Sequence, residues 1–365
     1  MKRVLHIIDH LGLGGAQAVL LDLVTLLDRT QWDCEVAVMH GRGLFAEALE
    51  AEGIKVHELS PSPWLPIYVP NFIRLQRDFD VLHFHLSGAN WIAKPLAAIV
   101  GEQPRIAHDH ASDQLHFRGI GSMLVDAAMH RFSSHTIAVA PAGKKFLTEY
   151  GALSPESVTV IPNGIKTELF RPFSLEEKKE ARAFFQLPEE AFIIGTAGRL
   201  APEKNQKMFL EAAHQAIQKG LRATFVIAGA GPEESALRHL AARLEISNSV
   251  RFLGQVQERV LLYRALDLFA LPSRYEGLPI VLLEAMASGV PVVCTDLEGI
   301  HYALEGGLHG GLVPSDDVEA LAKVFLDHDH AARKKMAESA RRKVEEDFSS
   351  SRAAAAVGAL YRQLL

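Results

Sequence analysis

Short apolar segments alternate with longer amphipathic segments along the chain. The first apolar segment, Arg3 to Asp9, is rich in branched residues and ends at a glycine-rich turn, GLGGAQ, at residues 12–17. A helical pattern follows, in which apolar residues recur at three-residue spacing: Ala18, Leu21, Val24 and Leu27. Further strands are predicted over 34–40, 80–85, 105–110 and 134–140, and helices over 44–52 and 142–150. Such alternation predicts a parallel sheet covered by helices on both faces.

The segment from Val158 to Phe173 predicts a domain boundary, because it contains Pro162 and Pro172 and precedes a charged helix. A second alternating series follows, with strands predicted over 191–198, 223–231, 250–254, 266–273 and 291–296. The sequence therefore predicts an α/β protein with two doubly wound, Rossmann-like domains, residues 1–165 and 166–347. Since ligands of such sheets bind beyond the carboxyl ends of the strands, we expect the site in the cleft between the domains.

Composition excludes several classes of protein. The 365 residues are 48% hydrophobic and 22% charged, as in folded proteins, and the net charge of −6 disfavours a nucleic-acid binder. Two cysteines, Cys34 and Cys294, are too few for a disulfide framework or a four-thiolate zinc site. No uninterrupted apolar stretch reaches the length of a membrane-spanning helix, and Asp9 leaves no room for a signal peptide. We expect a cytoplasmic protein, with peripheral contact to the inner face of the membrane left open.

The turn GLGGAQ differs from a dinucleotide-binding fingerprint. The third glycine of that fingerprint is replaced by Gln17, and the second predicted strand ends in His40 instead of a ribose-binding acid, so a dehydrogenase is disfavoured. Gly14 and Gly15 still allow a backbone to approach a ligand, and the following helix N-terminus favours an anion. A plain strand-to-helix turn is the alternative.

Two carboxylates flank a predicted helix start in SRYEGLPIVLLEAMASGVPVVCTD, residues 273–296. Pro279 suits the first helical turn, and Gly289 suits the helix end. A fully helical spacing between Glu276 and Glu284 would be about 12 Å, whereas the paired carboxylates of glycosidases lie roughly 5 to 9.5 Å apart. The pair therefore disfavours hydrolysis and favours contact with two ends of one extended ligand.

Backbone and cationic groups near these acids could bind phosphate. The N–H groups of Leu278, Ile280 and Val281 lie at the predicted helix start. Arg199 and Lys204, in GRLAPEKNQ, follow a predicted strand and could clamp a diphosphate. The alternatives are a capping acid with one solvated glutamate, and ordinary surface charge.

Histidines end one of the first domain's strands. His108 and His110 are two residues apart and so point to one face. With His83 and His85 they could form a metal site, but Asp109, the acid within this strand end, points the opposite way. We therefore expect no metal here, and a neutral histidine that hydrogen-bonds a hydroxyl group. Two buried, satisfied histidines without a function are the third reading.

Taken in order, these segments resemble the retaining glycosyltransferases of family 4, which have the two-domain GT-B fold. The matching segments are GLGGAQ, RIAHDH, VIPNGIKTELFRP, GTAGRLAPEKN, FVIAGAGPE, VRFLGQV and EGLPIVLLEAMASGVPVVCTD. The resemblance implies transfer of a sugar from a nucleotide-diphosphate donor with retention at the anomeric carbon. It also implies no metal and no separate cofactor, and a final helix, about 348–365, that returns to the first domain.

The resemblance also assigns roles to residues. Glu276 would lie near the donor sugar, Glu284 would accept hydrogen bonds from the ribose diol, and Arg199 and Lys204 would hold the diphosphate. The implied catalytic residues are His110, with His108 as the alternative, Glu276, Lys204 and Arg199. The implied donor-binding residues are Gly14, Gly15, Asn163, Gly277, Leu278, Ile280, Val281 and Glu284, and Asn163 and Gly164 match the interdomain turn.

The expected donor is a UDP- or GDP-sugar, and the expected acceptor is a glycan or a lipid-linked group. Residues 61–72 and 110–124, with their aromatic and apolar side chains, are the expected acceptor-side loops. Assembly of bacterial surface polysaccharide or glycolipid is the expected setting. A nucleotide-sugar epimerase of similar fold and a non-catalytic sugar-nucleotide-binding protein are the alternatives.

Overall fold

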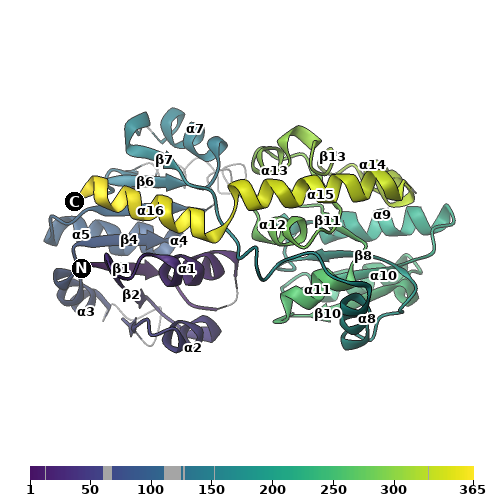
Figure 1. Cartoon of the computed structure of the whole chain (residues 1–365), viewed down its shortest axis with the longest axis horizontal. Coiled ribbons are helices and arrows are strands. Elements are labelled where there is room, and N and C mark those ends of the chain that lie inside the picture. The colour runs from purple at the N-terminus through teal and green to yellow at the C-terminus, as the bar shows by residue number, and fades with distance from the viewer. Residues whose placement is uncertain (13, 61–67, 111–124, 126–127, 152, 328) are drawn as a thin grey trace. The chain divides into compact units, whose positions relative to one another are not determined.

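Two parallel β-sheets, one in each of two units, organise the computed structural model of the chain (Figure 1). The structure describes residues 1–365 except 13, 61–67, 111–124, 126–127, 152 and 328. Unit 1 comprises Met1–Lys166 and Phe348–Leu365, and unit 2 comprises Thr167–Asp347. Most of the two predicted acceptor-side loops therefore lies outside the described residues.

Unit 1 contains a seven-stranded sheet of order β3-β2-β1-β4-β5-β6-β7, with every pairing parallel. Its strands are β1 (Lys2–Ile8), β2 (Trp32–Val38), β3 (Val56–Glu58), β4 (Val81–His85), β5 (Arg105–Asp109), β6 (His135–Ala138) and β7 (Val158–Val160). Its α-helices are α1 (Gly15–Leu26), α2 (Gly43–Ala51), α3 (Tyr68–Leu75), α4 (Leu86–Gly88), α5 (Lys94–Val100), α7 (Pro141–Glu149) and α16 (Ser350–Leu364). A π-helix spans Ala89–Ala93, and 3₁₀ turns span Gln76–Asp78 and Pro155–Ser157.

Unit 2 contains a six-stranded parallel sheet of order β10-β9-β8-β11-β12-β13. Its strands are β8 (Phe192–Ala197), β9 (Ala223–Ala228), β10 (Val250–Gly254), β11 (Leu268–Leu271), β12 (Val292–Thr295) and β13 (Gly311–Val313). Its α-helices are α8 (Leu175–Phe184), α9 (Gln206–Gln218), α10 (Glu234–Arg243), α11 (Arg259–Ala265), α12 (Ile280–Ala287), α13 (Glu298–Ala303), α14 (Val318–Leu326) and α15 (His330–Asp347). Turns of 3₁₀ helix span Pro202–Lys204, Ser247–Ser249 and Glu305–Gly307.

These sheets confirm the predicted fold class. Both have the doubly wound strand order in which the first strand lies in the interior and later strands are added on its two sides. The order reverses between β1 and β4 in unit 1 and between β8 and β11 in unit 2. Ligands of open parallel sheets bind at the carboxyl ends of the strands at such a reversal, so the loops after these four strands are the candidate binding loops.

Alternation along the strands separates the core of unit 1 into two faces. Val4, Ile8 and Val81 face a cluster that includes α1 and α16, whereas Leu5, Ile7, Leu82 and Phe84 face a cluster with α3 and α5. His6 and His83 share their face with the first set, because side chains two positions apart lie on the same face. Polar imidazoles therefore occupy positions on an otherwise aliphatic face.

Helix α16 belongs to unit 1, where it packs on α1 (Figure 1). Ile165 N donates to Phe348 O at 2.9 Å, and Ser350 N donates to Ile165 O at 2.9 Å, so the two chain segments that connect the units run side by side. Gly164 is required here because a Cβ atom would lie 2.6 Å from the backbone of Ser349 and Ser350.

Two further expectations were tested by the structure. Cys34 and Cys294 are buried free thiols, and burial raises the pKa of Cys34 to about 12. Among the helices in the described residues, none combines the length and the apolar character needed to cross a membrane.

Candidate active site

An ion pair joins the loops that follow β8 and β11 in unit 2. Lys204 Nζ lies 2.7 Å from Glu276 Oε1, and Ser273 Oγ donates to the same oxygen at 2.7 Å. Glu276 is 8% exposed, whereas the side chain of Lys204 is 25% exposed. Because both loops leave strands at the reversal of strand order, this pair lies where a ligand of the sheet is expected.

Arg199 lies two residues after the end of β8 and is exposed. Its backbone carbonyl accepts a hydrogen bond from Gln206 Nε2 at 3.1 Å, which ties the loop to α9. Both cations of GRLAPEKNQ follow the same strand, β8. Within the described residues, the guanidinium of Arg199 makes no ion pair, whereas Lys204 pairs with Glu276. Whether the two clamp a diphosphate stays a prediction.

Two glycines allow the strand ends of this region to approach one another. Gly198 and Gly229 have φ angles of 149° and 144°, values that L side chains rarely adopt. A Cβ atom on Gly229 would lie 1.9 Å from Gly198 O. Gly229, the first glycine of GAGPEE, is therefore needed for backbone contact with the loop that contains Arg199.

Glu284 lies inside α12 and is 1% exposed. It forms an ion pair with Arg259 and accepts a hydrogen bond from the Tyr263 hydroxyl at 2.8 Å. Burial and the nearby carboxylate raise the pKa of Tyr263 well above its usual range, which keeps the hydroxyl protonated as a donor. The predicted need of this buried acid for a partner is therefore met by α11, and the alternative of a solvated glutamate at this position is wrong.

The N-terminus of α12 lies between the two glutamates in sequence. The helix begins at Ile280, and its C-terminal Gly289 has a φ of 73°, as expected of a terminating glycine. Pro279 has an extended ψ of 122° and caps the helix, so its predicted place in the first turn is wrong by one residue. The first-turn amides of Ile280 and Val281 have no acceptor earlier in the helix and can bind an anion. Leu278 beside them is buried, and Gly277 is half-buried.

In unit 1, the turn after β1 leads into α1. Gly14 precedes the helix with φ 177° and ψ 162°, which is ordinary extended backbone, and Gly15 is the first helical residue. Asp9 accepts hydrogen bonds from Gly88 N at 2.9 Å and Ala89 N at 2.5 Å, so it holds the helical segment after β4. Among the described residues, none supplies a side-chain cap to the α1 N-terminus, which remains a candidate anion site.

Five histidines form what we term the histidine cluster: His6, His83, His85, His108 and His110. The rings of His108 and His110 stack with centroids 4.2 Å apart, which confirms that both side chains lie on one face of the sheet. His83 Nδ1 contacts the Tyr361 hydroxyl at 2.6 Å. The predicted hydrogen bond from a strand-end histidine to a ligand hydroxyl stays a prediction. Among the residues that the structure describes, neither ring nitrogen of His108 has a hydrogen-bond partner, so these residues alone do not satisfy this histidine.

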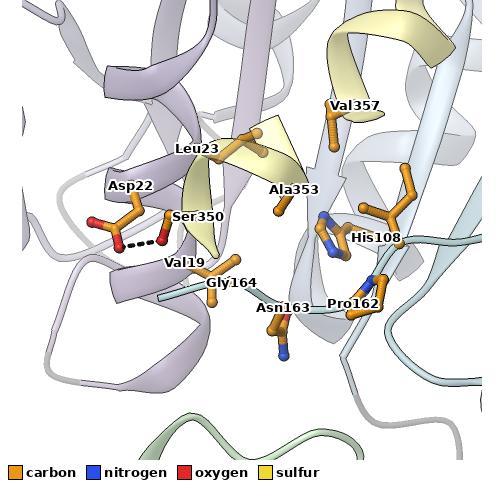
Figure 2. A pocket seen from close by; sticks show the side chains of 11 residues that line it. Val19, Asp22, Leu23, His108, Pro162, Asn163, Gly164, Ser350, Ala353 and Val357 are labelled. Atoms are coloured by element: carbon orange, nitrogen blue, oxygen red, sulfur yellow. Dashed lines mark hydrogen bonds between the residues drawn. The ribbon is translucent and has the colours of Figure 1, made fainter. Parts of the chain in front are cut away.

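Burial keeps these imidazoles neutral near neutral pH. Loss of hydration lowers the pKa of His110 to about 4, and a hydrogen bond with Asn163 partly opposes the shift. His108 is also shifted well below the usual histidine range by burial, with the nearby histidines adding to the effect. His108 and Asn163 line a small pocket of about 10 Å³ together with Gly164 (Figure 2). The pocket has room for about one water molecule, so it is not itself a donor site.

Apart from Lys204, sequence reasoning did not find the residues that hold the two glutamates. Ser273, Arg259 and Tyr263 supply their hydrogen bonds, and Arg274 forms an ion pair with Asp316 at 2.7 Å beside the same loops. The four-residue spacing of Arg259 and Tyr263 places both side chains on one helix face, and this spacing could have indicated that they share a partner.

Comparison with known proteins identifies the family to which both halves of the chain belong. Two family models match: Glycosyltransferase Family 4 over residues 13–169, and Glycosyl transferases group 1 over residues 177–343. EpsF of Bacillus subtilis strain 168, described as a glycosyltransferase, is 28% identical over 332 residues, which are 86% of this chain and 83% of EpsF.

Two further proteins are similar over much of the chain. The UDP-Gal:alpha-D-GlcNAc-diphosphoundecaprenol alpha-1,3-galactosyltransferase of Escherichia coli is 23% identical, covering 68% of this chain and 66% of that protein. The crystal structure of Anabaena Alr3699/HepE with UDP-glucose matches with a TM-score of 0.88 and 23% identity over 100% of this chain and 99% of that one. The chain belongs to glycosyltransferase family 4, and is a retaining enzyme of GT-B fold that uses nucleotide-sugar donors.

Proposed function

We propose that this enzyme transfers a sugar from a UDP-sugar to a glycan or lipid-linked acceptor in the synthesis of surface polysaccharide or glycolipid. The observation that carries the donor half of the proposal is the Lys204–Glu276 ion pair at the strand reversal of unit 2. The acceptor half is supported by the Escherichia coli relative, a galactosyltransferase that acts on a GlcNAc-diphosphoundecaprenol. The choice of uridine is supported by that relative and by the UDP-glucose complex of the Anabaena protein.

In this proposal, unit 2 binds the nucleoside diphosphate part of the donor. Lys204 and Arg199 neutralise the diphosphate, and the first-turn amides of Ile280 and Val281 donate to its oxygens. Glu284 accepts from the ribose hydroxyls, while Glu276 orients Lys204 and accepts from the donor sugar. These groups supply the positive charge that the leaving group requires, so the diphosphate needs no bound metal.

The reaction follows from this placement of charge. As the bond between the sugar and the diphosphate breaks, negative charge grows on the leaving oxygen beside Lys204 and Arg199, and these cations stabilise it. The acceptor hydroxyl forms its new bond on the face that the diphosphate leaves, and its proton goes to the departing phosphate oxygen. The contributions of Gly14, Gly15, Asn163 and His110 from unit 1 remain predictions of the family resemblance.

A donor screen tests the proposal. The full chain is incubated with individual UDP- and GDP-sugars, excess chelator, and glycan or polyprenyl-diphosphate-sugar acceptors, and products are identified by mass spectrometry. We expect nucleoside diphosphate release from a UDP-sugar together with an acceptor that has gained one sugar. Conversion of the donor into an isomer without an acceptor would show an epimerase, and tight binding without turnover would show a non-catalytic protein. Loss of donor release with chelator would contradict the metal-free diphosphate clamp.

A further inference from the structure

Three of the clustered histidines occupy adjoining core positions of the unit 1 sheet. His6 on β1 pairs in register with His83 on β4, and His85 follows two residues later on the same face. All three are 0% exposed. The neighbouring side chains on that face are aliphatic, for example those of Val4 and Val81. Branched apolar residues would therefore be expected at the positions of the three histidines.

The ring nitrogens of these residues approach one another closely. His6 Nδ1 lies 3.1 Å from His85 Nε2, and one nitrogen from each of the three rings lies within 4.8 Å of the other two. In a tetrahedral zinc site with zinc–nitrogen bonds of 2.0–2.1 Å, two ligand nitrogens are about 3.4 Å apart. The His6–His85 contact is an imidazole–imidazole hydrogen bond in the metal-free chain, and its length is close to the separation of two ligands on one ion, so an ion would replace this bond.

Several nitrogens in this group have no partner. His6 Nε2, His83 Nε2 and His85 Nδ1 are buried without a hydrogen bond among the residues that the structure describes. A buried polar atom without a partner loses its hydration and gains nothing in exchange. An ion bound to His6 Nδ1, His83 Nε2 and His85 Nε2 would give a partner to one of these atoms, His83 Nε2; His6 Nε2 and His85 Nδ1 are the second nitrogens of their rings.

Tyr361 of α16 orients the third ring. Its hydroxyl lies 2.6 Å from His83 Nδ1, which leaves His83 Nε2 as the nitrogen available to a ligand. A metal-binding histidine usually has its other ring nitrogen fixed by such an outer hydrogen bond. Tyr361 is itself 0% exposed, so this bond is shielded from water.

We propose that His6, His83 and His85 bind one divalent transition-metal ion, with Zn²⁺ as the preferred ion. Imidazole nitrogens suit zinc, and three histidines with an open fourth position are an established zinc ligand set. The rings lie 23° to 35° from parallel, so binding requires them to turn about their terminal torsions, which are broad. The bound ion would connect β1 and β4 and, through Tyr361, fix α16 on the sheet.

A second set of three, His85, His108 and His110, also has nitrogens within 4.8 Å. We favour the first set because all of its members are fully buried, while His110 is partly exposed. The short His6–His85 contact and the bond to Tyr361 also belong to the first set. The site is independent of the proposed diphosphate clamp, which lies wholly in unit 2, and sugar transfer does not require it.

The test measures metal directly and uses no donor. The full-length chain is stripped with chelator, loaded with Zn²⁺, dialysed, and analysed by elemental mass spectrometry, and Co²⁺ loading is followed by its tetrahedral visible absorption. We expect close to one ion per chain and a rise in melting temperature with Zn²⁺. His6→Gln and His85→Gln should abolish retention, and Tyr361→Phe should weaken affinity about 10- to 100-fold.

His135→Gln is the matched control, because His135 is a buried histidine on β6 of the same sheet and lies outside the cluster. It should retain the ion. Wild-type protein that neither retains an ion nor gains stability with Zn²⁺ would overturn the proposal, even where a variant fails to fold. Loss of the ion in His110→Gln together with retention in His6→Gln would also overturn it, in favour of the second set.

Discussion

Lys204 Nζ lies 2.7 Å from Glu276 Oε1, and these two residues are 72 positions apart in the sequence. The pair brings a cation and an acid to the reversal of strand order in unit 2, and Ser273 fixes the same carboxylate oxygen. Glu276 therefore orients Lys204, while the greater exposure of the lysine leaves its ammonium group accessible to a ligand.

The first prediction concerns Lys204→Ala. Removal of the ammonium group should lower the rate of nucleoside diphosphate release about 100-fold or more, as does loss of one charge-stabilising donor in other enzymes. The buried Glu276 carboxylate keeps its bond from Ser273, so the free energy of unfolding should fall by only about 1–3 kcal/mol. Turnover is measured by nucleotide release, and stability by urea denaturation.

Lys207→Ala is the control for this variant. Lys207 lies three residues later, at the start of α9, and its ammonium group forms an exposed ion pair with Glu211 at 3.7 Å. Exposed pairs of this kind contribute roughly 0–1 kcal/mol, so both turnover and stability should stay near the wild-type values. Equal activity of the two variants would remove Lys204 from the proposed site.

The second prediction separates the ligand role of Glu284 from its structural role. Tyr263→Phe removes one hydrogen bond to the carboxylate, and Glu284→Gln removes the charge. Both should lower the free energy of unfolding by about 1–3 kcal/mol. Only Glu284→Gln should also weaken nucleoside diphosphate binding, about tenfold, which corresponds to one lost ribose hydrogen bond. Equal loss of affinity in both variants, measured by calorimetry, would show that Glu284 acts through the packing of α11 and α12.

The two sheets could be predicted from sequence because each buried strand is a short apolar segment between turn residues. The predicted segment 250–254 coincides with β10, and 191–198 contains β8 with one extra residue at each end. Such local patterns depend on residues close together in the chain. Pro279 was misplaced by one residue, since composition does not distinguish a helix cap from the first helical position.

Contacts between distant elements could not be predicted in the same way. His108 and His110 were placed on one face by alternation alone, but the proximity of His6 depends on the register of β1 against β4, which the pattern does not specify. Similarly, the apolar sequence around Glu284 predicts that this buried carboxylate needs a partner. The identity of the partners, Arg259 and Tyr263, depends on how α11 packs against α12 and could not be predicted.

A third prediction concerns Gly164→Ala. A methyl group at this position would lie 2.6 Å from backbone atoms of Ser349 and Ser350, where no side-chain movement can relieve the clash. The free energy of unfolding of unit 1 should fall by about 1–3 kcal/mol, and hydrogen exchange at the start of α16 should increase. Gly358→Ala, within α16 itself, is the comparison, because its methyl group would meet side-chain atoms at 3.3–3.4 Å. An equal or larger effect of Gly358→Ala would contradict this account.

The last prediction is the pH dependence of the α8 capping box. Ser174 Oγ accepts from Glu177 N at 3.2 Å, Glu177 accepts from Ser174 N at 2.9 Å, and Arg171 bonds the same carboxylate at 2.8 Å. The Arg171 guanidinium, followed by the Ser174 amide, lowers the pKa of Glu177 from 4.5 to about 2. Because the folded-state pKa lies below the unfolded value, this stabilisation is fully present above pH 4.5 and is lost as the pH falls toward 2.

Glu177→Gln should therefore lower the melting temperature of unit 2 at neutral pH, and the difference from wild type should shrink between pH 4.5 and 2. Glu176→Gln removes a charge from the same first turn without altering the box, and its effect should not follow this pH course. Melting curves of the three proteins across this range check the prediction. A difference between wild type and Glu177→Gln that stays constant down to pH 2 would contradict this account, because it would show that the difference does not arise from ionisation of the carboxylate.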